Sequence, residues 1–163
     1  MKKLLKILVL AAFLGALGLL PFRSTDAAKL LPVKTVVVTK SGDCYTVDVG
    51  AGVKALGRSL TEALRRLREE VTGVLFLPTA EQVVLTEPAA EAAEAVAEEP
   101  GFRPAMGIYR TPDADPDPAA LGEYLASHPS NTTILNVRAA LAAGETPRIP
   151  RIRAVQGGFL VAE

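Results

Sequence analysis

Apolar residues recur at helical spacing between residues 59 and 73, with arginine and glutamate at the positions between them. The apolar positions are Leu60, Leu64, Leu67 and Val71. Ser59 and Glu62 have the spacing of a capping box, in which each side chain accepts a hydrogen bond from the backbone N–H of the other residue. Gly73 is typical of the residue that ends such a helix. The pattern predicts a capped amphipathic helix that packs one face against a core.

Two short apolar segments follow this helix. Residues 74–77 are all apolar, Pro78 and Thr79 are turn residues, and residues 83–85 are apolar again. Such segments are too short for surface helices. We expect both to be buried strands.

Residues 30–39 and 44–49 are rich in β-branched residues and are separated by the turn residues 41–43. They predict an antiparallel hairpin, with Cys44 as a passive strand residue. Residues 50–57 contain glycines but lack the Lys-Ser/Thr ending of a phosphate loop, and Ala55 stands where a dinucleotide motif needs its third glycine. We interpret this segment as a flexible link into the first helix.

Strands and helices continue to alternate in the second half of the chain. We expect an exposed alanine-rich helix within residues 87–99, a strand at 105–110, helices at 119–127 and 134–143, and two strands around a turn at 157–158. Because strands and helices interleave and the first hairpin is antiparallel, the sequence predicts an α/β (α+β) fold. It would comprise a mixed sheet with about four packed helices.

The N-terminus combines basic and apolar residues in the order of an export signal. Three lysines precede an apolar run at residues 7–20, which is shorter than the roughly 20 residues that span a bilayer comfortably. We therefore predict a signal peptide or membrane anchor at residues 1–27, with the lysines on the cytoplasmic side, and a single domain at residues 30–163. The protein would be exported, and either membrane-anchored or extracytoplasmic.

Composition narrows the classes of function. The 163 residues have a formal net charge of zero, so the chain has no overall positive charge that would attract nucleic acid. We therefore expect no nucleic acid as a partner. Four of the 18 basic residues and one of the 18 acidic residues lie in residues 1–27, which leaves 14 against 17 in the rest of the chain. Cys44 is the only cysteine, which excludes an intramolecular disulfide.

Candidate chemistry is sparse. Asp113, Asp115 and Asp117 resemble the start of a calcium loop, but the glycine and glutamate that such a loop requires are absent, and we expect a stiff loop in which Asp117 caps the next helix. His128 is the only histidine and has no evident partner in the sequence. Asn131 begins a glycosylation-type triplet that helix capping explains equally well. We therefore assign no catalytic, cofactor-binding or metal-binding residue, and no cofactor.

Three stretches together resemble the N-terminal domain of the Ger(x)C family, the lipoprotein C subunits of spore germinant receptors. They are residues 58–85, in which a helix leads into two apolar strands, residues 131–137, and residues 147–160 with their Pro-Arg-Ile-Pro-Arg-Ile segment. The likeness covers roughly residues 34–161. The family's lipid-attachment cysteine has no counterpart, because Cys44 lies well downstream of the leader, and the sequence stops near where the family's second domain would be expected to begin.

The resemblance implies a non-enzymatic, envelope-associated protein of a spore-forming bacterium that acts through protein contacts in germination or sporulation. Its partners would be germinant receptor subunits or other envelope proteins, at a site such as the spore inner membrane. One alternative is an exported enzyme or metal-binding protein that uses Asp113, Asp115, Asp117 and His128. Another is a purely structural envelope module. For a binding surface, the candidates are the connection after residues 106–110 and the loop at 113–118, because stiff irregular loops often carry recognition.

Overall fold

The computed structural model describes residues 29–156 and 158–162, so the predicted signal or anchor at residues 1–27 lies outside the described residues. The strands are β1 (Leu30–Pro32), β2 (Thr35–Ser41), β3 (Cys44–Asp48), β4 (Lys54–Gly57), β5 (Val74–Phe76), β6 (Gln82–Thr86), β7 (Gly107–Thr111), β8 (Arg151–Val155) and β9 (Gly158–Ala162). The α-helices are α2 (Leu60–Glu70), α3 (Ala93–Glu98), α4 (Pro118–Ser127) and α5 (Ile134–Ala142), and the 3₁₀ helices are η2 (Leu77–Thr79) and η3 (Glu87–Ala92).

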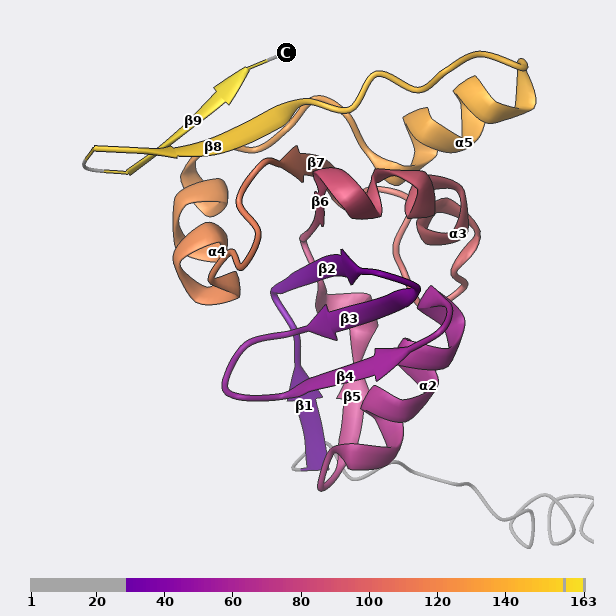
Figure 1. Ribbon diagram of the computed structural model, residues 1–163, viewed down its shortest axis with the longest axis vertical. Coiled ribbons are helices and arrows are strands. Elements are labelled where there is room, and N and C mark those ends of the chain that lie inside the picture. The colour runs from indigo at the N-terminus through magenta and orange to yellow at the C-terminus, as the bar shows by residue number, and fades with distance from the viewer. Residues whose placement is uncertain (1–28, 157, 163) are drawn as a thin grey trace, which may run out of the picture.

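Seven strands form a mixed sheet in the order β4-β3-β2-β6-β7-β8-β9 (Figure 1). The four central strands, β2, β6, β7 and β8, are parallel, whereas β3, β4 and β9 run antiparallel to their neighbours. The predicted hairpin is present as β2 and β3. Together with the four α-helices of the described chain, this confirms the predicted α+β fold class.

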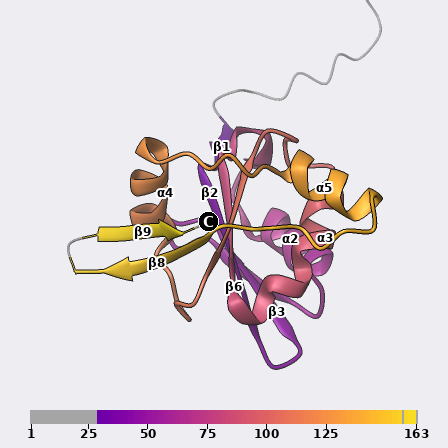
Figure 2. The same cartoon turned by 90° about the horizontal axis from the view of Figure 1, so that it is seen from above.

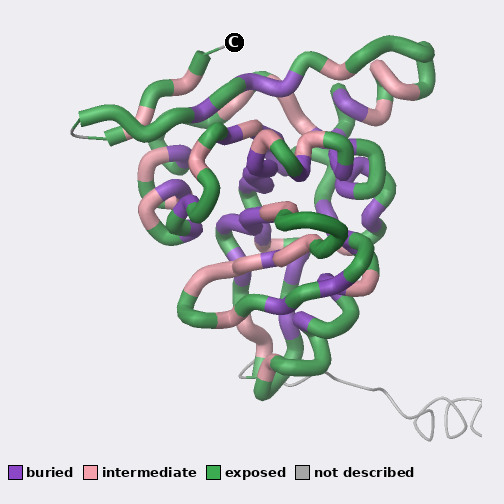
Figure 3. The backbone as a smooth tube through the Cα atoms, in the orientation of Figure 1, coloured by how far each residue is buried: buried purple, intermediate pink, exposed green. Residues whose placement is uncertain are grey.

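Helices cover both faces of the sheet (Figure 2). Alternate residues of the central strands point to opposite sides, so Val36 and Val83 join the larger core with α2, α3 and α5, whereas Val37 and Val84 join a smaller core with α4. Buried positions concentrate along the central strands and the inner helix faces (Figure 3). The sheet is thus the middle layer of three.

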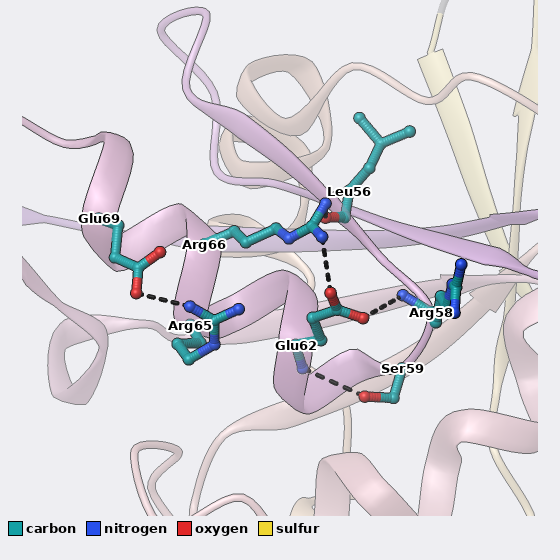
Figure 4. Close-up of polar contacts among 7 residues, drawn as sticks. All are labelled: Leu56, Arg58, Ser59, Glu62, Arg65, Arg66 and Glu69. Atoms are coloured by element: carbon teal, nitrogen blue, oxygen red, sulfur yellow. Dashed lines mark hydrogen bonds and ion pairs between the residues drawn. The ribbon is translucent and has the colours of Figure 1, made fainter.

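Helix α2 begins as predicted. The Glu62 N–H donates to the Ser59 hydroxyl oxygen at 3.2 Å, so Ser59 is the N-cap residue (Figure 4). The Glu62 carboxylate, however, accepts from the Arg58 N–H at 2.8 Å rather than from the Ser59 N–H. Hydrogen bonding to Arg58 lowers the Glu62 pKa, because the bond favours the ionised carboxylate. The cap therefore reaches one residue further back than the capping-box pattern predicts.

The first predicted strand is divided into two parts. β1 leaves the main sheet and pairs in parallel with β5, forming a separate two-stranded ribbon. Val33, which follows β1, is bound through its backbone N–H and carbonyl to the Thr79 hydroxyl at 3.0 and 3.1 Å. The expectation that residues 74–77 are wholly buried is wrong, because Val74 and Phe76 are 44% and 36% exposed on this ribbon.

Residues 50–57 are not a flexible link. After a tight turn in which Gly50, Ala51 and Gly52 all have positive φ, the chain forms β4 and pairs antiparallel with β3. β4 then presents Ala55 to the larger core. Pairing with a neighbouring strand, which the short Lys-Ala-Leu-Gly segment does not reveal, decides its structure.

The alanine-rich segment is not an exposed helix. It forms the 3₁₀ helix η3 followed by α3, and Ala89, Ala93, Val96 and Ala97 are buried in the larger core. Alanine side chains are small enough to let a helix approach its neighbours closely. The weak apolar face of this segment is therefore a close-packed face.

Candidate functional site

A cleft of about 1010 Å³ lies beside β7, between two irregular segments. One wall is residues 129–132, between α4 and α5, and the other is residues 146–150, between α5 and β8. Arg110 of β7 and Val161 of β9 complete the lining. The full lining is Arg110, Pro129, Ser130, Asn131, Thr132, Thr146, Pro147, Arg148, Ile149, Pro150 and Val161.

The two walls separate because they pair with different halves of β7. At the start of β7, the Ile108 N–H donates to the Thr132 carbonyl at 3.2 Å, and Gly107 forms an antiparallel bridge with Thr133. At the end of β7, the Arg110 N–H donates to the Pro150 carbonyl at 2.8 Å, and β8 begins. The edge of one strand therefore places both walls, and the cleft opens between them.

The lining carries hydroxyl, amide and guanidinium groups together with proline, isoleucine and valine side chains. Thr132 donates its N–H to the Ser130 hydroxyl at 2.8 Å, which holds the first wall in a compact turn. Arg148 is exposed, whereas Arg110 is partly buried and its Nε has no hydrogen-bond partner among the described residues. The cleft therefore has a positive charge and polar groups suited to an anion.

Tyr109 lies beneath the first wall. Its side chain is fully buried in the smaller core, and its hydroxyl donates to the His128 carbonyl at 3.3 Å. Burial raises the pKa of the Tyr109 hydroxyl, and hydrogen bonding to Ser130 opposes this rise. The tyrosine ties the start of the wall to the sheet.

We expect Tyr109→Phe to reduce the loss of stability at alkaline pH. Because the folded-state pKa is raised, the contribution of Tyr109 is present below its unfolded pKa of about 10 and is lost as pH rises through the folded value. Urea unfolding of both proteins across about pH 8 to 11 measures how steeply the free energy of unfolding of each falls with pH. Equal loss of free energy of unfolding in both proteins would contradict this assignment.

His128 lies at the end of α4, outside the cleft lining. Its ring stacks on Tyr124 with centroids 4.2 Å apart and an interplanar angle of 9°. Its Nδ1 is 3.0 Å from both the Ser127 hydroxyl and the Tyr124 carbonyl. The exposed ring therefore lies at the C-terminal end of α4. None of these contacts involves a carboxylate.

The aspartate loop lies before α4. Asp117 accepts from the Ala119 N–H at 2.9 Å as the predicted N-cap, and the Asp113 N–H donates to the Thr111 hydroxyl at 3.2 Å. Within the described part of the chain, no three His, Cys, Asp or Glu side chains form a group that could hold a metal ion. The loop does not line the cleft, and neither of the two predicted binding segments contributes a lining residue, because Arg110 belongs to the strand that precedes them.

Cys44 and Asn131 occupy different surroundings. Cys44 is exposed at the start of β3, and Asn131 lies in the cleft wall just before Thr133, which caps α5 through a capping box with Asn136. Sequence reasoning missed the second wall, although its two prolines were a signal for an extended segment outside the sheet.

Comparisons with protein-family models, with curated proteins and with solved structures find no match to this chain. Among residues 29–156 and 158–162, no helix has the length and apolar character needed to cross a membrane. The resemblance to the Ger(x)C family therefore stays a prediction.

Proposed function

We propose that the chain is a non-enzymatic, envelope-associated protein of a spore-forming bacterium, similar to germinant receptor C subunits, that acts through protein–protein contacts in germination or sporulation. The observation that carries this proposal is the composition of the cleft. Its lining offers guanidinium, hydroxyl, amide and apolar groups, but no carboxylate, imidazole or thiol. Such a surface can bind and orient a partner, whereas general acid–base catalysis calls for groups of the kind it lacks.

The position of the cleft within the resemblance gives further support. Its walls come from residues 129–132 and 146–150, which overlap two of the three stretches that resemble the family. Helix α5 separates the two walls in the sequence, and both walls line the same cleft in the folded chain. A shared contact surface would explain why both stretches take part in the resemblance to the family.

The β1–β5 ribbon supports association with the envelope. Leu31 and Leu75 pack into the larger core, so the alternation of strand residues places Leu30, Pro32, Val74 and Phe76 on the outward face. This apolar face begins directly after Lys29, close in sequence to the predicted signal or anchor at residues 1–27. An apolar surface at that junction suits a position against a membrane.

Fractionation of sporulating cells and mature spores carrying a C-terminally tagged protein tests the proposal. We expect recovery with receptor subunits in the spore membrane fraction, and mass spectrometry of the N-terminus would distinguish a retained anchor from a cleaved signal. A variant with Val74→Ser and Phe76→Ser tests the contribution of the ribbon to membrane recovery. Recovery as a soluble exported protein of vegetative cells, without spore association, would contradict the proposal.

A further inference from the structure

The second cleft wall lies outside the strands, and among the described residues its backbone is bound to β7 only at Pro150. Residues 145–150 belong to no helix or strand, and among the described residues the N–H groups of Thr146, Arg148 and Ile149 have no hydrogen-bond partner. Ile149 is nevertheless only 8% exposed. Backbone N–H groups are normally paired in a folded chain, so this wall, which lines the cleft, has backbone donors without a partner among the described residues.

The two arginines of the cleft have no acidic partner among the described residues. Five other cations of the described chain form ion pairs: Lys40, Arg65, Arg66, Arg68 and Arg151. Arg110 lies between the two walls and keeps a buried Nε without a hydrogen-bond partner. A guanidinium forms strong contacts with a carboxylate, to which it can donate two parallel hydrogen bonds.

We infer that the cleft binds an extended, acidic peptide segment of a partner protein. The peptide backbone pairs with the N–H groups of Thr146 and Arg148, which lie two positions apart and so can share one side of an extended segment, in the manner of a strand added to an open edge. A glutamate or aspartate of the peptide reaches Arg110 and Arg148, and neighbouring apolar side chains contact Pro129, Pro147 and Val161. The inference rests on the proposed function and specifies the chemistry of the partner.

The size of the cleft favours a peptide over a single small anion. Its volume of about 1010 Å³ lies at the upper end of ligand sites, which span roughly 300–1,000 Å³. One carboxylate would occupy a small part of it. The unpaired backbone wall adds a feature that a peptide uses and a simple anion does not.

The test uses the purified full chain, immobilised in detergent, and an equimolar mixture of two eight-residue peptide libraries. One library has glutamate fixed at its fourth position, the other has glutamine there, and the remaining positions are randomised. Mass spectrometry measures the ratio of the two among retained peptides. We expect about a tenfold preference for glutamate, because hydrogen bonds to charged groups are stronger than those to a neutral amide.

Arg148→Gln is the main variant because Arg148 is exposed and its replacement leaves the core intact. It should bring the ratio close to one, as should Arg110→Gln if that variant folds by circular dichroism. Arg153→Gln is the matched control, since Arg153 is an exposed arginine of β8 outside the cleft lining, and it should retain the preference.

Three results would overturn the inference. These are equal retention of both libraries, an unchanged preference in Arg148→Gln, and complete displacement of the peptides by free glutamate at the same concentration, which would indicate a small carboxylate as the ligand. Absence of the protein from spores would instead contradict the proposed function, while leaving the preference for glutamate peptides intact.

Discussion

Gly57→Ala is expected to destabilise the folded chain by about 3 kcal/mol or more, because the added methyl group meets backbone rather than flexible side chains. A Cβ at Gly57 would lie 2.4 Å from the Ala63 backbone nitrogen and 2.9 Å from the Ala63 Cα. Gly57 ends β4 at the point where the first turn of α2 crosses it. Relief of the clash requires the helix to move away from the sheet.

Chemical denaturation of the full chain, followed by circular dichroism, measures this effect. Leu56→Ala is the matched control, because Leu56 precedes Gly57 on the same strand and is exposed. The control should change the free energy of unfolding by no more than about 0.5 kcal/mol. A Gly57→Ala protein as stable as this control would show that α2 does not approach β4 as closely as the structure has it.

Leu64→Ala should cost about 2–5 kcal/mol, which is the usual range for a truncated core leucine. Leu64 is 0% exposed and lies on the face of α2 that packs into the larger core. The substitution leaves a cavity that the surrounding strands and helices cannot fill completely. The same denaturation experiment gives the change in free energy of unfolding.

Leu135→Ala is the control for this second experiment, because it removes the same atoms from a helix surface. Leu135, on α5, is 58% exposed. We expect it to change stability by no more than about 0.5 kcal/mol. Similar losses for both leucines would contradict the division of the chain into a core face and an exposed face.

Elements with local signals were predictable from the sequence. Ser59 caps α2, Asp117 caps α4 and Thr133 caps α5, because a capping hydrogen bond joins residues only two or three positions apart. The β2–β3 hairpin was also predictable, since its turn lies between two β-branched segments. These features depend on neighbours along the chain.

Elements stabilised by distant partners were mispredicted. β4 depends on pairing with β3, and the exposed residues of β5 depend on its departure from the main sheet to join β1. The buried alanines of η3 and α3 depend on close approach to other elements. Composition favoured a loop, a buried strand and an exposed helix at these three places, and tertiary contacts determined a different result at each.

Almost none of the candidate site could be predicted from the sequence. Arg110 lay at the end of a predicted strand, next to a predicted binding segment, but residues 129–132 and 146–150 carried no sign that they would face each other. Their separation follows from hydrogen bonds to opposite ends of β7, through Ile108 and Arg110. Such long-range pairing leaves no periodicity or spacing in the chain.

By itself, the sequence determined the α+β class, the N-terminal caps of α2 and α4, and the first hairpin, because each arises from interactions between nearby residues. Only the tertiary structure decided the strand order, the separate β1–β5 ribbon and the cleft. These depend on which distant segments satisfy one another's backbone hydrogen bonds and bury one another's apolar faces. The cleft lies beside β7, where the backbone partner of this strand changes from residues 132–133 to residues 150–151.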